Sequence, residues 1–198
     1  MRLSCVIFLC GALLLVTGSG GALLEAVRFR RGAVAAACLA LSVLCGAVWR
    51  VGNAEICPAV PAAALVFPFL VRGGRMRLMA ALSAVPCGVL AWMLSAAFPT
   101  ATECGPFAIV PVLLTCLLLG GAREGLCAAA LLPVVYGLLS AAEGLYLFGY
   151  APLSIGGGVQ SDLLACGAAA VWLYAMAHKA LARVRAHARA PARPGEEG

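Results

Sequence analysis

The sequence predicts an all-α fold, a polytopic membrane helix bundle with seven transmembrane helices, its N-terminus outside and its C-terminus cytoplasmic. The amino-acid composition, a series of apolar segments and the placement of the basic residues lead to this prediction. Of the 198 residues, 64% are hydrophobic and 11% are charged. A soluble domain carries about 25% charged residues, so a water-soluble fold of this chain would lack the charge to cover its surface.

Seven apolar segments follow one another along the chain, separated by short polar or glycine-rich connections. A membrane-spanning helix needs about 20 apolar residues, within a range of about 17 to 25. The third segment is the shortest and contains three prolines, which makes it the weakest of the seven. The expected spans are residues 3–27, 32–49, 56–71, 78–98, 106–122, 125–148 and 162–177.

The first segment has two interpretations, a cleaved signal peptide or a retained helix. Arg2 alone precedes it, whereas Arg28, Arg30 and Arg31 follow it. A signal peptide carries its positive charge before the apolar region. The reversed charge favours a retained helix whose N-terminus lies outside.

Basic residues gather in three turns, 28–31, 72–77 and 120–124, and in the tail 178–198. All but two of the 14 Lys and Arg lie there, and cytoplasmic loops of membrane proteins carry such an excess. The pattern predicts a multi-pass protein of the plasma (inner) membrane. It also explains the net charge of +6 without nucleic acid as a partner.

These segments predict a transmembrane helical domain, residues 1–177, and a basic cytoplasmic tail, residues 178–198, that is partly disordered. The lipid bilayer is the first expected partner. The tail has two interpretations, a plain topology anchor or a binding site for anionic lipid headgroups. A membrane or cytoplasmic protein partner is a further expectation.

Arg31, Arg77 and Arg123 are spaced 46 residues apart. This spacing suggests three parallel helical-hairpin repeats followed by one helix, related by an axis along the membrane normal. The alternative is that Ala- and Leu-rich helices of standard length resemble one another by chance.

No catalytic or metal-binding pattern stands out, so the sequence predicts a protein that is not an enzyme and uses no metal or cofactor. The two histidines, His178 and His187, both lie in the tail. The chain has neither a His-Glu-x-x-His pair nor a Cys-x-x-Cys pair.

Spans three to six each contain an interior proline. Proline removes a backbone hydrogen bond and clashes with the preceding turn, which kinks a helix. We expect kinks that expose backbone groups to a cavity among these spans; the alternative is that proline is simply common in membrane helices. The four prolines are Pro68, Pro86, Pro111 and Pro133.

A candidate site for a solute or a cation lies where the sixth and seventh spans meet. Tyr136, Ser140 and Glu143 share one helical face, and Asp162 begins the next helix behind its predicted cap, Ser161. Two carboxylates at one site favour a cation, a proton or a cationic solute. In the other interpretation Asp162 only starts a helix, and Glu143 turns outward or pairs with Arg50.

Most of the ten cysteines lie within apolar segments, where a thiol packs as a small hydrophobic group. Cys57 and Cys104 instead lie at two outer ends of helices. If their spans are neighbours, the sequence allows a disulfide between them; otherwise both are free thiols.

The sequence therefore predicts an integral membrane protein that binds or transports a small solute, alone or as the membrane subunit of a transporter. The alternative is a non-transporting sensor or an assembly or scaffold subunit that acts through its basic cytoplasmic tail.

Overall fold

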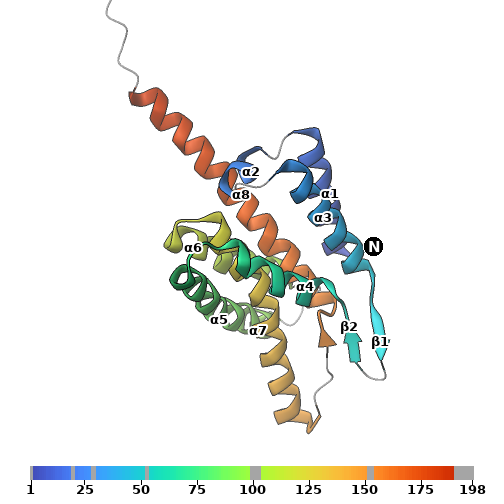
Figure 1. The fold of residues 1–198 in the computed structure, drawn as a ribbon. Coiled ribbons are helices and arrows are strands. Elements are labelled where there is room, and N and C mark those ends of the chain that lie inside the picture. The colour runs from blue at the N-terminus through green and yellow to red at the C-terminus, as the bar shows by residue number, and fades with distance from the viewer. Residues whose placement is uncertain are drawn as a thin grey trace, which may run out of the picture.

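The computed structural model describes residues 2–18, 21–27, 30–51, 54–98, 104–150 and 154–189. Helices dominate these residues, and three short strands form one small sheet (Figure 1). In chain order the elements are α1 (Leu3–Thr17), α2 (Gly21–Val27), α3 (Arg31–Gly46), β1 (Trp49–Val51), β2 (Ala54–Ile56), α4 (Ala59–Val66), η1 (Phe67–Leu70), α5 (Gly74–Ala97), η2 (Gly105–Ala108), α6 (Ile109–Leu119), α7 (Ala122–Phe148), β3 (Ser154–Ile155) and α8 (Gly158–Arg189).

The described helices confirm an all-α membrane protein. By length and composition α5, α7 and α8 can cross a membrane, and α1 with α2 makes a fourth candidate if the bent pair counts as one span. The other apolar helices are shorter; α3, at 16 residues, is about 24 Å long, against about 30 Å of hydrocarbon in a bilayer. Helix length therefore supports three or four spans, although each of the seven predicted segments is helical.

The first predicted span is two helices, because α1 ends at a glycine. The axes of α1 and α2 differ in direction by 95°. Gly18 has φ +99°, a left-handed conformation that side chains disfavour, and its N–H bonds the carbonyls of Leu14 and Leu15. Composition predicted an apolar run here, but it did not show where the helix would stop.

Helix α8 runs through the middle of the molecule, with α1 and α2 on one side and α6 and α7 on the other (Figure 1). Close approach of these helices depends on glycine. A Cβ added to Gly88 of α5 would lie 2.6 Å from Val135 of α7, and one added to Gly167 of α8 would lie 3.0 Å from Ala129 of α7. Small residues give this packing in membranes, where burial from water does not drive helices together.

Helices α1 and α3 form a second unit, in which the two helices pack on each other and α1 makes the main contact with α8. Helix α4 packs mainly on α7 and η1, not on α5. The predicted pairing of the third and fourth spans as a hairpin is therefore not a main contact of the fold, and the three proposed hairpins are not packed alike.

The three arginines at 46-residue spacing all donate hydrogen bonds to carbonyls at helix ends. Arg31 bonds the carbonyls of Leu15 and Val16 at the end of α1. Arg77 bonds the carbonyl of Val71 after η1 at 3.3 Å. The last carbonyls of a helix lack partners within the helix and carry partial negative charge, so each guanidinium both satisfies and neutralises a helix terminus.

Arg123 does the same over a long sequence distance. Its Nε and Nη2 donate to the carbonyl of Val27, the last residue of α2, at 3.1 and 2.6 Å. This contact fixes α2 to the start of α7. The basic turns thus hold helix ends together in addition to any role in orientation.

A three-stranded sheet was not predicted. Strand β1 pairs antiparallel with β2, and β2 pairs parallel with β3. The missed signal is the Gly52-Asn53 pair between two runs that include β-branched residues, because two such residues between short strands are typical of a hairpin. The sheet ties the end of α3, the start of α4 and the start of α8 to one another.

The four predicted kinks fall into two groups. Pro86 and Pro133 lie inside the continuous helices α5 and α7. Pro111 is instead in the first turn of α6, where a backbone N–H has no helical partner to lose. Pro68 follows the end of α4 and lies in the 3-10 helix η1, so it accompanies a helix stop and not an interior kink.

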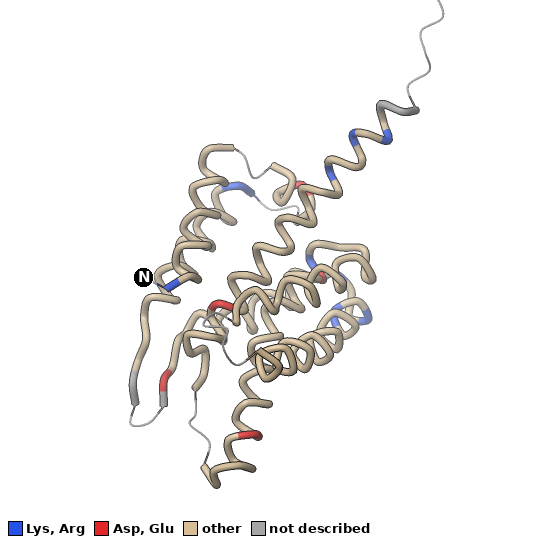
Figure 2. The backbone as a smooth tube through the Cα atoms, turned by 180° about the vertical axis from the view of Figure 1, so that it is seen from behind, with Lys and Arg blue, Asp and Glu red and all other residues tan. Residues whose placement is uncertain are grey.

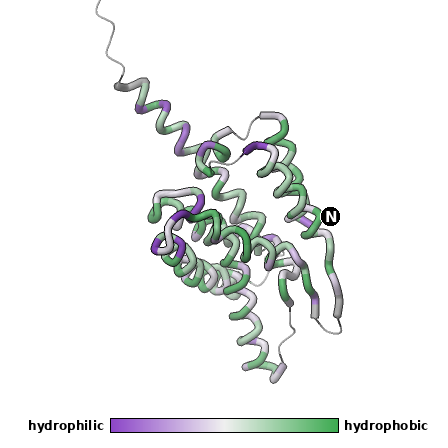
Figure 3. Tube along the Cα trace, in the orientation of Figure 1, coloured by the Kyte–Doolittle hydropathy of each residue, from purple (hydrophilic) through white to green (hydrophobic). Residues whose placement is uncertain are grey.

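Helix α8 extends past both ends of the predicted seventh span, 162–177. It begins at Gly158, so Ser161 and Asp162 lie within the helix, and Ser161 Oγ bonds the carbonyl of Gly158 instead of capping. At the other end the helix continues to Arg189, so there is no break at 177. Its last turns are basic and hydrophilic and project away from the bundle (Figures 2 and 3). Residues 190–198 lie outside the described part of the chain.

Candidate functional site

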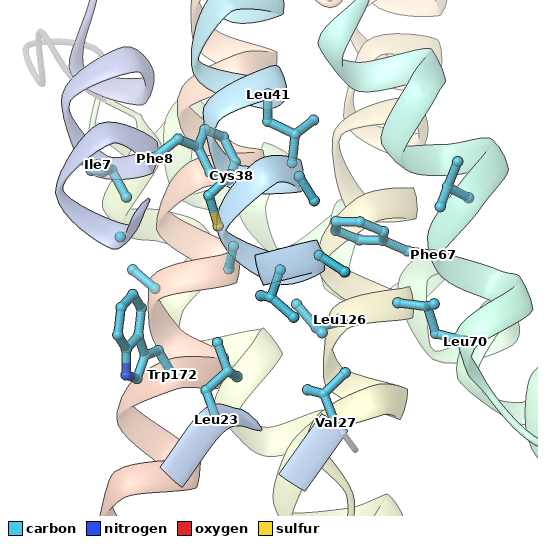
Figure 4. A pocket seen from close by; sticks show the side chains of 17 residues that line it. Ile7, Phe8, Leu23, Val27, Cys38, Leu41, Phe67, Leu70, Leu126 and Trp172 are labelled. Atoms are coloured by element: carbon cyan, nitrogen blue, oxygen red, sulfur yellow. The ribbon is translucent and has the colours of Figure 1, made fainter. Parts of the chain in front are cut away.

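An apolar pocket of about 260 Å³ lies where the α1–α3 unit meets α7 and α8 (Figure 4). Its wall comes from α1, α2, α3, α4, η1, α7 and α8, so segments far apart in the sequence close around it. The lining residues are Ile7, Phe8, Gly11, Leu23, Val27, Ala33, Val34, Ala37, Cys38, Leu41, Val66, Phe67, Leu70, Leu126, Ala168, Ala169 and Trp172.

The space results from small residues placed opposite large ones. Ala37 on α3 and Ala168 on α8 leave room that Phe8, Phe67 and Trp172 border but do not fill. Gly11 lets α1 approach α8, because a Cβ added there would lie 3.1 Å from the Trp172 ring. The pocket therefore results from the packing of several helices and not from one sequence motif.

The pocket is open on one side. Ala33, Ala37 and Val66 line it and are also exposed on the outer surface of α3 and α4. In a bilayer this side would face lipid chains. A molecule dissolved in the hydrocarbon could therefore enter between α3 and α4.

One polar group is left without a partner at this site. Trp172 Nε1 is buried and has no hydrogen-bond acceptor among the described residues. A buried N–H without an acceptor is destabilising, and native proteins rarely leave such groups unpaired. Because this nitrogen is buried, a molecule in the pocket would meet carbon atoms of the Trp172 ring, and the apolar lining suits an apolar ligand.

The predicted solute site is divided between two interfaces. Glu143 Oε2 accepts a hydrogen bond of 3.0 Å from Trp92 Nε1 of α5, and Tyr136 OH donates to Ser95 Oγ of the same helix at 3.3 Å. Ser140 is half-buried on this face of α7. These three predicted residues thus lie on the face of α7 that contacts α5.

Asp162 has a different neighbour. Its Oδ1 accepts a hydrogen bond of 3.0 Å from the backbone N–H of Ser4, in the first turn of α1. That turn has free N–H groups and partial positive charge, so the carboxylate acts as a cap supplied by another helix. The structure gives Asp162 and Glu143 separate partners; their joint role in a solute site stays a prediction.

The two cysteines considered for a disulfide are free thiols in the structure, as are the other eight. Cys57 is buried, and its Sγ donates to the carbonyl of Leu44 near the end of α3 at 3.3 Å. Cys104 is half-buried before η2, and burial raises the pKa of its thiol. Within the described residues no group of His, Cys, Asp and Glu is arranged to hold a metal ion.

The pocket lies at a different place from the cavity that the interior prolines predicted. The sequence placed a cavity among spans three to six, but the pocket is lined by the first, second, third, sixth and seventh segments. Its small residues, among them Gly11, Ala37 and Ala168, are ordinary in membrane helices, so no sequence signal marked them as a site.

Comparison with known proteins adds no functional information: no family model, no curated protein and no solved structure matches the chain. The candidate site therefore rests on its geometry alone.

Proposed function

We propose that this membrane protein binds a small, mainly apolar molecule in the pocket between the α1–α3 unit and α7–α8. One observation carries the proposal. The pocket of about 260 Å³ is lined by apolar side chains from seven elements. An apolar cavity of this kind stays free of water and accepts apolar guests.

This proposal narrows the solute-binding or transport role expected from the sequence. The ligand is placed in the pocket and not at Glu143 and Asp162, because each carboxylate is already hydrogen-bonded to a different helix. Binding would be the first step of transport, and it would equally serve a membrane subunit that holds a ligand for another protein. Neither role requires catalysis.

We further propose that the protein resides in the plasma (inner) membrane with its N-terminus outside and its C-terminus cytoplasmic. The support is the charge distribution: Lys and Arg gather at the starts of α3, α5 and α7 and along the end of α8 (Figure 2). Cytoplasmic segments carry such an excess of basic residues.

Orientation is tested with single cysteines in a background that lacks the native ones. A cysteine at exposed Tyr150 should react with an impermeant thiol reagent added outside intact cells, whereas one at exposed Gly74 or Ala186 should react only after lysis. Outside labelling at Gly74 would refute this orientation.

Binding is tested with 1-aminoanthracene, a small apolar fluorophore, added to the purified protein in detergent. We expect saturable binding of one probe per chain, abolished by Ala37→Phe, which fills the pocket. Ala40→Phe is the matched control, because Ala40 is exposed on the same helix but does not line the pocket. Equal binding by both variants would show that the pocket is not the site. Uptake of a bound compound into proteoliposomes then separates transport from binding alone.

A second function is favoured by the length of α8. Its 32 residues span about 48 Å, which exceeds the hydrocarbon thickness, and residues 181–186 are exposed. An exposed basic helix outside the bilayer suits an assembly or scaffold subunit that contacts a cytoplasmic protein. Deletion of residues 180–198 should then release a copurifying partner, and an unchanged set of partners would contradict this alternative.

A further inference from the structure

A second, basic pocket lies one helical turn beyond the apolar one. It has a volume of about 350 Å³ and is formed by α2, the end of α1 and α8. Its lining residues are Gly18, Gly21, Ala22, Met176, Lys179, Ala180 and Arg183. On α2 the two pockets are neighbours in sequence, because Ala22 lines the basic pocket and Leu23 lines the apolar one.

One face of α8 connects the two pockets. Trp172 borders the apolar pocket, and Met176, Lys179 and Arg183 follow at steps of three or four residues, which places all four on the same side of the helix. The face therefore changes from apolar to basic along its length, over about 16 Å between the Cα positions of Trp172 and Arg183.

The charge around the basic pocket is mainly positive. Lys179 Nζ lies 2.6 Å from Glu25 Oε1, an ion pair whose carboxylate side chain is 68% exposed. Arg183 lines the same pocket. Two cations, Lys179 and Arg183, therefore line the pocket, and the one acidic partner that Lys179 has there, Glu25, is largely exposed to solvent.

We propose that the two pockets together bind one anionic lipid, with a hydrocarbon chain in the apolar pocket and a phosphate headgroup at Lys179 and Arg183. The inference rests on the proposed function, because it assigns a ligand class to the same apolar pocket. A lipid satisfies both parts at once, since it is an apolar chain that ends in an anion.

The position of the site in the membrane agrees with this ligand. In the proposed orientation Lys179 and Arg183 lie at the cytoplasmic surface, where anionic lipids concentrate and basic side chains gain affinity from them. The opening between α3 and α4 gives a chain access from the bilayer, so the lipid need not leave the membrane to bind.

The test is native mass spectrometry of the purified full-length protein in detergent, titrated with phosphatidylglycerol or with phosphatidylcholine of identical chains. The wild type should bind one phosphatidylglycerol at least about tenfold more tightly than phosphatidylcholine; two basic contacts at a membrane surface correspond to about thirtyfold. Equal affinity for the two lipids would overturn the headgroup assignment and leave the apolar pocket as proposed.

Charge variants locate the headgroup. Lys179→Gln combined with Arg183→Gln should reduce phosphatidylglycerol binding to the level of phosphatidylcholine. Arg185→Gln makes the same charge change on the same helix, but it lines a different pocket beside Leu117 and His178, so it should leave the preference unchanged. A preference that survives the double variant, or is lost in Arg185→Gln as well, would show that the headgroup binds elsewhere or that only general surface charge matters.

Two further measurements distinguish an error in the apolar pocket from an error in the lipid assignment. Ala37→Phe should weaken binding of both lipids, and unchanged binding of both would refute the apolar pocket itself and with it the proposed function. Inorganic phosphate at millimolar concentration should not displace phosphatidylglycerol. Displacement by phosphate alone would show that the basic pocket takes a soluble phosphate compound and would overturn the lipid assignment.

Discussion

The α5–α8 part of the molecule and the α1–α3 unit are both apolar and helical, but different contacts hold them. Glycine and alanine bring α5, α7 and α8 into close contact, as at Gly88 and Gly167. The α1–α3 unit uses hydrogen bonds at helix ends: Asp162 bonds the first turn of α1, and Arg31 bonds its last carbonyls. The closely packed helices α5, α7 and α8 thus carry the α1–α3 unit at their side, and the pocket lies at the junction between them.

The largest effect should come from a substitution inside the closely packed part. Gly88→Leu places a side chain where even a Cβ would lie 2.6 Å from Val135 Cβ, so α5 and α7 must separate. We expect a loss of about 3 kcal/mol in the free energy of unfolding, measured by denaturant titration in mild detergent. Gly32→Leu on α3 is the control, because nothing lies within 4 Å of an added Cβ there; equal losses would contradict the distinction between the two units.

The second-largest loss of stability should come from breaking the contact that joins α2 to α7. Arg123→Gln removes the charged donors to the Val27 carbonyl, and hydrogen bonds to charged groups contribute about 1.5 to 3 kcal/mol. We expect a loss of about 2 kcal/mol and faster proteolysis near α2. Arg75→Gln, at an exposed position in the preceding basic turn, should have little effect on stability. A similar loss there would show that positive charge in the turn, and not the hydrogen bond to Val27, stabilises the protein.

Removal of the carboxylate that caps α1 should cost less. Asp162→Ala breaks the bond to the Ser4 N–H, and we expect a loss of about 1 kcal/mol with increased hydrogen exchange in α1. Glu143→Ala breaks the bond to Trp92 within the other part of the molecule and should leave exchange in α1 unchanged. If both variants instead alter solute binding and its pH dependence together, the carboxylates share a site as the sequence suggested.

The smallest effect should come from the exposed ion pair between α2 and α8. Glu25→Gln removes the partner of Lys179, and we expect a change in the free energy of unfolding below about 1 kcal/mol, as is typical of surface pairs. The same variant should slightly strengthen phosphatidylglycerol binding, because it removes the carboxylate that competes for Lys179. A large loss of stability would show that this pair, and not Arg123, fixes α2.

Sequence reasoning found the membrane class and the helical segments because both depend on local composition. It was less successful with helix ends. Gly18 stops α1 inside a run that reads as one span, and Pro68 accompanies the end of α4 where an interior kink was predicted. It also missed the β1–β2 pairing, although Gly52-Asn53 is a signal for a hairpin, because the polar residues that follow Arg50 equally fit a loop between two spans.

Local sequence features are enough to predict an apolar, helical membrane protein with all but two of its Lys and Arg in three turns and the tail, since each of these properties depends on residues near one another in the chain. Which groups the polar side chains contact, and where the pocket lies, depend on the tertiary structure. Arg123 meets the end of α2, 96 residues away, Asp162 meets α1 instead of Glu143, and a pocket opens among five of the seven predicted segments. Such contacts follow from how helices pack in three dimensions. Small residues such as Gly11 and Ala168 permit close packing, but their sequence does not indicate which helix they pack against.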